Sequence, residues 1–329
     1  MSAGKAILVA CAAAVATGAF VRVRRLKRAV KDAEGRLEDC AAETAMLSYG
    51  RMTYVDRRPS DEASDGKGLS DERPRNKRPG DGGSEEVVLS AHGLYGGYDQ
   101  AYENVGTLSS RYRILAPSRF GYPGSSVKGE GTPREQAEAY AELLDRLGIE
   151  QVFILGVSAG GAPAIRFALD FPQRAKGLIL YCSAVPWNEK PARIPSLMGP
   201  PPIMNHDLPM WLAFPLYRRL YGMEADVVHG MLPLSRRKEG ADLDARIVNR
   251  DMAVNFEAYP IEEMHVPVLL LHARDDRMAP FKGPAGQVEG SLHRYPNLET
   301  KIFETGGHLM TGHSREIDAA VVEFIERHK

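Results

Sequence analysis

Short apolar runs recur from residue 87 onward and are separated by stretches with helical spacing. The runs are rich in β-branched and aromatic residues and cover residues 87–91, 112–116, 152–155, 178–181, 266–271 and 301–303. Continuous apolar runs of this length are typical of parallel strands that are buried on both faces. Helical patterns cover residues 133–147, 159–169 and 314–328. This alternation predicts an α/β fold with a doubly wound, mostly parallel sheet.

Residues 186–259 interrupt this alternation. They contain no strand pattern and many prolines, and their large apolar side chains include Trp187, Met198, Met204, Met210, Trp211, Phe214, Tyr217 and Tyr221. The segment is too long for a simple connection and too apolar for a linker. It predicts a helical cap inserted into a sheet domain made of residues 46–185 and 260–329. The aromatic side chains either pack the cap on that domain or line an apolar pocket.

The chain begins with an uncharged run, residues 6–21, which a basic cluster follows directly (Arg22, Arg24, Arg25, Lys27 and Arg28). The run is long for the core of a signal peptide and slightly short for a bilayer span. Because basic residues stay on the cytoplasmic side of a membrane, we expect residues 1–45 to form a membrane anchor and basic stalk, with the domain that follows in the cytoplasm. Export after cleavage of a signal peptide is the alternative.

Two segments between the stalk and the first long run have their own patterns. Residues 46–55 predict a hairpin that turns at Gly50. Residues 57–86 are rich in Pro, Gly, Ser and charged residues, and Leu69 is their only large aliphatic residue. Such a stretch cannot bury enough apolar surface to offset its chain entropy, so it predicts a disordered insertion.

Composition narrows the possible partners. The formal net charge is -1, which gives no electrostatic bias toward nucleic acid. Cys11, Cys40 and Cys182 are scattered and without metal-like spacing, which favours a reducing compartment. The chain has no phosphate-binding loop, no dinucleotide fingerprint and no His-Glu-x-x-His motif, and His308 with His313 lacks a third ligand. We therefore expect no cofactor and no bound metal.

The strongest chemical signal is Gly156-Val157-Ser158-Ala159-Gly160, which follows an apolar run and precedes a helical stretch. A serine between a strand and a helix sits on a sharp, strained turn, and small neighbours let the backbone approach closely. The helix N-terminus also favours negative charge that develops nearby. This context indicates that Ser158 is a nucleophile. A glycine-rich turn with a capping serine is the alternative.

From residue 46 to the C-terminus, apart from the predicted disordered residues 57–86, the chain resembles the α/β-hydrolase family, in which Gly-x-Ser-x-Gly carries the nucleophile. His92-Gly93-Leu94-Tyr95-Gly96-Gly97 follows a predicted strand, where the family has its oxyanion loop. The resemblance implies that the backbone N–H groups of Leu94 and Ala159 hold the substrate oxyanion. It also implies that His92 is structural and bonds within the loop.

The resemblance further implies an acid and a histidine downstream of the serine, in that order. His272-Ala273-Arg274-Asp275-Asp276-Arg277-Met278-Ala279-Pro280 is similar to the family's acid loop. The family's acid lies four residues before the proline, which selects Asp276, while Asp275 caps the turn or faces solvent. His308 ends a Gly-Gly-His turn after the last predicted strand, where the family has its base. His313 is expected at the entry to the terminal helix.

The loop of residues 117–125 and His272 are expected to have structural roles and no catalytic role. Residues 117–125 resemble the family's Asp-x-x-Gly-x-Gly-x-Ser loop, but Ser118 replaces the aspartate and Pro123 is inserted before the second glycine. This departure leaves the loop's conformation open. His272 ends a predicted strand and is expected to pack beneath the Asp276 loop.

These expectations together predict a serine hydrolase that cleaves a small-molecule carboxylic ester of lipophilic character through an acyl-enzyme. Other reactions stay open for the same residues: acyl transfer, amide cleavage and carbon–carbon bond cleavage. Epoxide hydrolases and haloalkane dehalogenases are disfavoured because their nucleophile is an aspartate. Two alternatives are not enzymatic: a non-catalytic binding protein of the hydrolase fold and a membrane-tethered scaffold.

Overall fold

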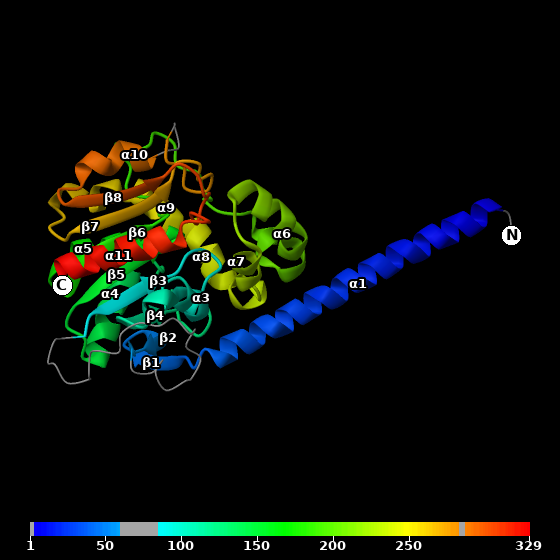
Figure 1. The fold of residues 1–329 in the computed structure, drawn as a ribbon, viewed down its shortest axis with the longest axis horizontal. Helices are drawn as coiled ribbons and strands as arrows, with labels where there is room; N and C mark the ends of the chain where they lie inside the picture. Colours follow the sequence, from blue (N-terminus) through cyan, green and yellow to red (C-terminus); the bar gives the residue numbers. More distant parts are fainter. Residues whose placement is uncertain (1–2, 60–84, 283–286) are drawn as a thin grey trace.

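The computed structural model describes the backbone of residues 3–59, 85–282 and 287–329, and the side chains of residues 21–59, 85–282 and 288–329. In this part of the chain one sheet has the strand order β1-β2-β4-β3-β5-β6-β7-β8 (Figure 1). The strands are β1 (Glu43–Leu47), β2 (Gly50–Arg57), β3 (Val87–Ala91), β4 (Arg113–Pro117), β5 (Val152–Val157), β6 (Ala175–Tyr181), β7 (Val268–Ala273) and β8 (Leu298–Phe303). The pairs β1–β2 and β2–β4 are antiparallel and the others are parallel, which confirms the predicted mostly parallel sheet.

Helices α4 (Pro133–Leu147) and α5 (Gly161–Asp170) cover one face of this sheet, and α3 (Tyr98–Glu103) and α11 (Ser314–His328) cover the other. The remaining helices of the described residues lie around them: α1 (Ala3–Asp39), α6 (Asp207–Tyr221), α7 (Ala225–Gly230), α8 (Lys238–Leu243), α9 (Asn249–Val254) and α10 (Gln287–Ser291). Successive strand residues point to opposite faces, so Leu89 and Ile154 pack with α4 and α5, while Val88 and Phe153 pack with α3 and α11. Strands β3, β4, β5 and β7 are buried at every position, which explains their continuous apolar runs.

Helix α4 has the ends that its sequence predicts. Thr132 is its N-cap and forms a capping box with Glu135, and Pro133 occupies the first turn. The helix ends at Gly148, whose φ of 65° lies in the left-handed region that glycine adopts without a Cβ clash. Local sequence signals therefore set both ends of this helix.

The expected hairpin is present and longer than predicted. Strands β1 and β2 pair from Glu43 with Tyr54 to Leu47 with Gly50, so the chain turns at Ser48 and Tyr49, just before Gly50. The strand β2 then pairs with β4 and joins the hairpin to the edge of the parallel sheet. The predicted disordered insertion, residues 57–86, falls mainly on residues 60–84, which lie outside the described residues.

The predicted stalk is the end of the long helix α1, and it is not free of the sheet domain. Ala33 and Leu37 are buried, and α1 contacts both α6 and α7. The hydroxyl of Tyr98 in α3 donates a hydrogen bond to the Leu37 carbonyl at 2.9 Å. Among the helices of the described residues, none combines the length and the apolar character needed to cross a bilayer. Residues 6–20 of the expected anchor lie outside the residues whose side chains the structure describes, so the anchor stays a prediction.

Residues 186–259, here called the insertion, lie between β6 and β7 and contain α6 to α9 without a strand (Figure 1). Two buried ion pairs join the insertion to the sheet domain. Arg119 after β4 makes a bidentate pair with Asp244 of the insertion, with both N–O distances at 2.6 Å. In the second pair the insertion supplies the arginine: Arg237 pairs with Asp99 of α3 at 2.7 Å. Because buried charges are costly without a partner, these pairs hold the two regions in one arrangement.

Candidate active site

Ser158 lies on the turn between β5 and α5. Its φ of 51° is in the left-handed region, which costs a non-glycine residue on the order of 1–3 kcal/mol and indicates a functionally strained turn. The neighbouring glycines make this turn possible: a Cβ on Gly160 would lie 2.2 Å from the Ala91 carbonyl oxygen, and one on Gly156 would lie 2.7 Å from the Gly160 oxygen. The sharp strand-to-helix turn expected for the motif is present.

His308 lies beside Ser158 although 150 residues separate them in the chain. The His308 Nε2 atom is 2.9 Å from Ser158 Oγ, and Nδ1 is 2.8 Å from Asp276 Oδ2. Asp276 accepts further hydrogen bonds from the backbone N–H groups of Met278 at 2.7 Å and Ala279 at 3.0 Å. A carboxylate held in this way keeps the proton on Nδ1 and leaves Nε2 as the acceptor for the serine hydroxyl.

The two adjacent aspartates have different partners. Asp276 bonds to His308, whereas Asp275 accepts the backbone N–H groups of Gly306 at 3.3 Å and Gly307 at 2.9 Å. Asp275 thereby holds the turn that carries His308, which agrees with the expectation that it caps a turn. His272 packs beneath the acid loop as expected, with Nε2 donating to the Ala279 carbonyl at 2.8 Å.

The buried acid and base stabilise each other's charged forms. Burial raises the pKa of Asp276, but the hydrogen bonds from His308 and Ala279 outweigh this effect and hold the pKa below its ordinary value. Burial lowers the pKa of His308, but the hydrogen bond to the Asp276 carboxylate and its negative charge act in the opposite sense, and the net pKa shift is upward. Burial also raises the pKa of the Cys182 thiol. His308 is therefore a stronger base than a free histidine.

The loop after β3 is held close to Ser158. Its His92 accepts the Arg119 N–H at Nε2 over 2.9 Å and donates from Nδ1 to the Gly93 carbonyl at 2.8 Å, which is the structural role expected for it. Ser118, which replaces the family's aspartate, accepts the Tyr98 N–H at 2.9 Å and so ties the neighbouring loop to α3. A Cβ on Gly93 would lie 3.2 Å from Ser158 Cβ, which is tighter than an ordinary contact, so glycine eases the close approach of the loop.

The two N–H groups expected to hold an oxyanion are available. The Leu94 N–H has no hydrogen-bond acceptor among the described residues, and Leu94 lines the pocket that contains Ser158. Ala159 lies in the first turn after β5, where N–H groups have no partner within the helix. Both groups can therefore donate to a bound substrate.

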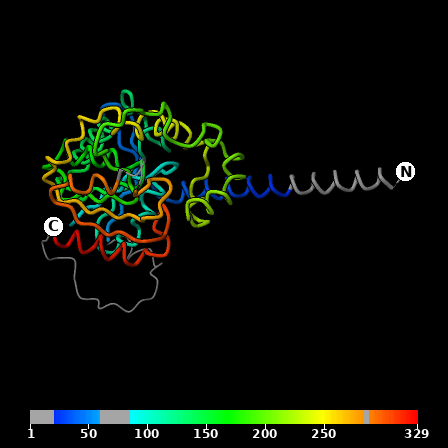
Figure 2. Tube along the Cα trace, turned by 90° about the horizontal axis from the view of Figure 1, so that it is seen from above, coloured from blue at the N-terminus to red at the C-terminus, as the bar shows by residue number. Residues whose placement is uncertain are grey.

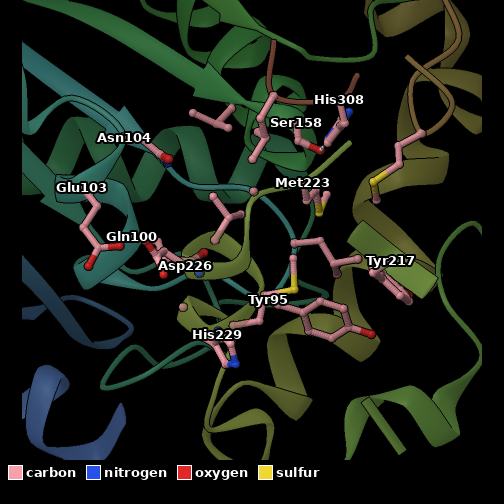
Figure 3. Close-up of a pocket in the computed structure, with 18 of the residues that line it drawn as sticks. Tyr95, Gln100, Glu103, Asn104, Ser158, Tyr217, Met223, Asp226, His229 and His308 are labelled. Carbon is pink, nitrogen blue, oxygen red and sulfur yellow. Dashed lines mark hydrogen bonds between the residues drawn. The ribbon is translucent and has the colours of Figure 1, made fainter. Parts of the chain in front are cut away.

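The pocket that contains Ser158 and His308 has a volume of about 460 Å³, within the range of small-molecule sites (Figure 3). Its apolar lining comes from both regions of the protein: Leu94, Tyr95, Val157, Tyr217, Met223, Val227, Met231, Met278 and Leu309. Its polar lining includes Arg36, Gln100, Glu103, Asn104, Asp226 and His229. Among the described residues, no three His, Cys, Asp or Glu side chains are grouped in a way that could bind a metal ion.

Sequence reasoning missed Arg36, which it assigned to the stalk. The Arg36 guanidinium donates to the carbonyl oxygens of Gly230 and Leu232 at 3.0 Å each, and it lies 3.4 Å from Asp99. It therefore joins α1, the insertion and α3 at the wall of the pocket. No periodic signal could reveal this position, because a helix of mixed charge looks the same whether or not its end packs on a domain.

A model of the Alpha/beta hydrolase family matches residues 87–320. The chain belongs to this family. It is also similar to a 2-hydroxy-6-oxo-6-phenylhexa-2,4-dienoate hydrolase of Burkholderia cepacia, with 35% identity over 106 residues, which are 30% of this chain and only 37% of that protein. A 2-hydroxy-6-oxononadienedioate/2-hydroxy-6-oxononatrienedioate hydrolase of Cupriavidus pinatubonensis is 29% identical over 265 residues, 74% of this chain and 88% of that protein.

A solved structure of an esterase from Thermogutta terrifontis has the same fold as this alpha/beta hydrolase. The TM-score is 0.61 at 18% sequence identity, over 88% of this chain and 99% of the esterase. At this level of identity the similarity concerns the fold, so the residues of the pocket carry the argument about the reaction.

Proposed function

We propose that this alpha/beta hydrolase is a serine hydrolase that cleaves uncharged, lipophilic carboxylic esters through an acyl-enzyme. The observation that carries the proposal is the continuous hydrogen-bonded chain from Ser158 through His308 to Asp276, at the wall of a largely apolar pocket. A serine hydroxyl becomes an effective nucleophile only when a positioned base removes its proton.

The distances allow each step of acyl transfer. Ser158 Oγ attacks the ester carbonyl carbon while His308 Nε2 takes the hydroxyl proton, and the Asp276 carboxylate stabilises the resulting imidazolium. The N–H groups of Leu94 and Ala159 donate to the oxyanion of the tetrahedral intermediate. The C–O bond to the leaving alcohol then breaks as His308 returns its proton to that oxygen. A water molecule repeats the sequence and releases the acid and Ser158.

The charges in the pocket favour an uncharged acyl group. Glu103 and Asp226 are carboxylates in the lining, and Arg36 is the one arginine or lysine among the described lining residues. Arg36 already donates to two backbone carbonyls and lies beside Asp99. A carboxylate on the substrate would therefore meet like charge without a free cation to pair with, which is unfavourable in a site of low dielectric.

Carbon–carbon bond hydrolysis is the second candidate, because the relatives named above act on dienoates. Their substrates carry one or two carboxylates by name, which is the feature that the acidic lining of this pocket disfavours. The two proposed reactions use the same serine and histidine and differ in the bond that breaks, a C–O bond in the ester and a C–C bond in the dienoate. Substrate charge therefore distinguishes the candidates better than the catalytic residues do.

The test is turnover of the full chain on p-nitrophenyl esters of increasing acyl length, beside a 2-hydroxy-6-oxo-dienoate measured by loss of its absorbance. We expect ester turnover and covalent labelling of Ser158 by a fluorophosphonate. Ser158→Ala and His308→Gln should lose turnover, while the control His313→Gln should keep it. Faster turnover of the dienoate would replace ester by carbon–carbon cleavage, and the absence of both turnover and labelling would refute a hydrolase function.

A further inference from the structure

Helix α6 has apolar side chains on opposite faces. Met210 and Phe214 are buried against the rest of the protein, with 0% and 5% of their surface exposed. On the other side lie four leucines at intervals of four residues, here called the leucine face: Leu208, Leu212, Leu216 and Leu220, which are 49%, 56%, 55% and 38% exposed. Residues four apart lie on one side of a helix, so these side chains form a continuous stripe.

Such a stripe needs an explanation. A helix that is apolar all round is normally buried in a protein core or in a membrane, whereas an ordinary surface helix has a polar outer face. Ile203, which is 65% exposed, lies just before α6 and adds another exposed apolar side chain. Contiguous exposed apolar patches mark sites of contact with another molecule or with a lipid surface.

The charges beside the leucine face indicate which surface covers it. Helix α1 contacts α6, and the part of α1 that extends beyond the rest of the protein carries an exposed basic cluster: Arg22, Arg24, Arg25, Lys27 and Arg28. Arg218 and Arg219 add two exposed cations at the end of α6 itself. Residues 21–32 of α1 extend from the side of the molecule on which α6 lies (Figures 1 and 2). Apolar side chains flanked by cations are the pattern of helices that lie in the interface of anionic bilayers.

We propose that the leucine face of α6 docks on an anionic lipid surface, with the basic cluster of α1 contacting the headgroups. A second copy of the chain fits the same surface less well. A two-fold dimer through α6 would bring the same patch of both copies together, and with it two sets of cations. Like charges at close range oppose such a contact, whereas they favour anionic headgroups.

Docking of α6 would bear directly on the active site. Tyr217, on the inner side of α6, lines the pocket, and the Tyr221 carbonyl at its end accepts the His308 N–H at 3.2 Å. The hydroxyl of Thr311 donates to the Gly222 carbonyl at 2.9 Å and joins the same two segments. A lipid-bound α6 would thus place the pocket next to the phase in which lipophilic esters concentrate. This last consequence depends on the proposed ester hydrolysis, but the docking itself does not.

The protein carries a natural probe for this contact. Trp211 is in α6, and Trp187 is the only other tryptophan in the chain. In a Trp187→Phe background of the full chain, tryptophan fluorescence reports on α6 alone. We expect lipids brominated on their acyl chains to quench Trp211 in phosphatidylglycerol-containing vesicles, and to quench it less in pure phosphatidylcholine or in high salt.

Variants separate the leucine face from general effects. The double variant Leu212→Asp, Leu216→Asp should need about tenfold or more lipid for half-maximal quenching of Trp211, because two exposed apolar side chains no longer enter the interface. The matched control Met46→Asp with Val254→Asp changes exposed apolar residues outside α6 and should leave quenching unchanged. Both variants should keep turnover of a short soluble ester, so failure of docking and failure of hydrolysis are read separately.

Three outcomes would overturn the proposal. Binding of vesicles without quenching of Trp211 would assign the membrane contact to another segment. No binding to anionic vesicles would exclude docking on an anionic lipid surface. Sedimentation could instead show a dimer that the Leu212→Asp, Leu216→Asp variant dissociates, and the leucine face would then be an interface between two copies of the chain.

Discussion

The sheet domain and the insertion face the same pocket, but they hold their side chains by different means. In the sheet domain, Ser158, Asp276 and His308 each follow the carboxyl end of a parallel strand, namely β5, β7 and β8. Neighbouring parallel strands end at one edge of a sheet, so the backbone ladder brings these residues together. In the insertion, Tyr217 of α6 and Met223, between α6 and α7, reach the pocket from segments that make no hydrogen-bonded ladder with the sheet.

The insertion depends instead on side chains for its position. The pairs Arg119–Asp244 and Arg237–Asp99, together with Arg36 of α1, join it to the sheet domain. Changes at the strand ends should therefore alter the chemical step, while changes at these contacts should alter stability and the choice of acyl group. Each of the following experiments tests one side of this division.

The largest effect is expected at the acid of the sheet domain. Asp276→Asn keeps the size of the side chain but removes the charge that orients and stabilises protonated His308, so kcat should fall about 10³–10⁴-fold. Asp275→Asn is the matched control, because the Asp275 carboxylate accepts hydrogen bonds from backbone N–H groups of the turn that carries His308. We expect its kcat to fall less than about tenfold. Steady-state kinetics on a p-nitrophenyl ester measure both. An equal loss of kcat in the two variants would mean that Asp276 is not the only carboxylate that orients His308.

The contact between the two regions should show itself in stability. Asp244→Asn leaves the buried Arg119 guanidinium without its anion, and the free energy of unfolding should fall by about 3–5 kcal/mol. Asp145→Asn, which removes an exposed partner of Arg174, should change it by about 1 kcal/mol or less. Urea unfolding measures both variants. Similar values for the two would show that the buried pair does not hold the insertion in place.

The pH dependence of the reaction tests the environment of His308. Its pKa is raised in the folded protein, so the imidazole stays protonated to a higher pH than a free histidine, and only the neutral form can act as the base. The ratio kcat/KM should therefore fall as the pH drops through this raised pKa. The midpoint of this acidic limb should lie above the ordinary histidine pKa of about 6.5. Asp276→Asn should move the limb to lower pH, and His313→Gln should not. A limb at or below 6.5 in the wild type would contradict the raised pKa.

The smallest effect is expected at Arg36. Arg36→Met removes the hydrogen bonds to Gly230 and Leu232, so α7 should lose its fixed position at the pocket wall. We expect KM for the longest accepted ester to rise about three- to tenfold, with kcat for a short ester unchanged. Arg28→Met is the control, because Arg28 is 86% exposed and pairs only with Asp32 at 3.9 Å. An equal loss on short and long esters would show that Arg36 has no part in substrate selection.

Much of the sheet domain could be read from the chain because its signals are local. Strands buried on both faces need continuous apolar runs, and Thr132, Pro133 and Gly148 mark the ends of α4 within a few residues of each boundary. The same holds for Ser158, since a strand followed by a glycine-flanked turn predicts an exposed side chain at a sheet edge. The assignment of His308 rested on the resemblance to the family. The choice of Asp276 over Asp275 required the resemblance to the family.

Other features were decided only by contacts between distant segments. The strand order, the opposed pairs Arg119–Asp244 and Arg237–Asp99, and the place of Arg36 in the pocket wall join residues far apart in the chain. A charged residue on a helix has the same local pattern whether it faces water or a buried partner. The sequence by itself, with the resemblance to the family, therefore determined the elements and the proposed catalytic residues at strand ends. The tertiary structure decided the shape and charge of the pocket, because those depend on which surfaces pack together.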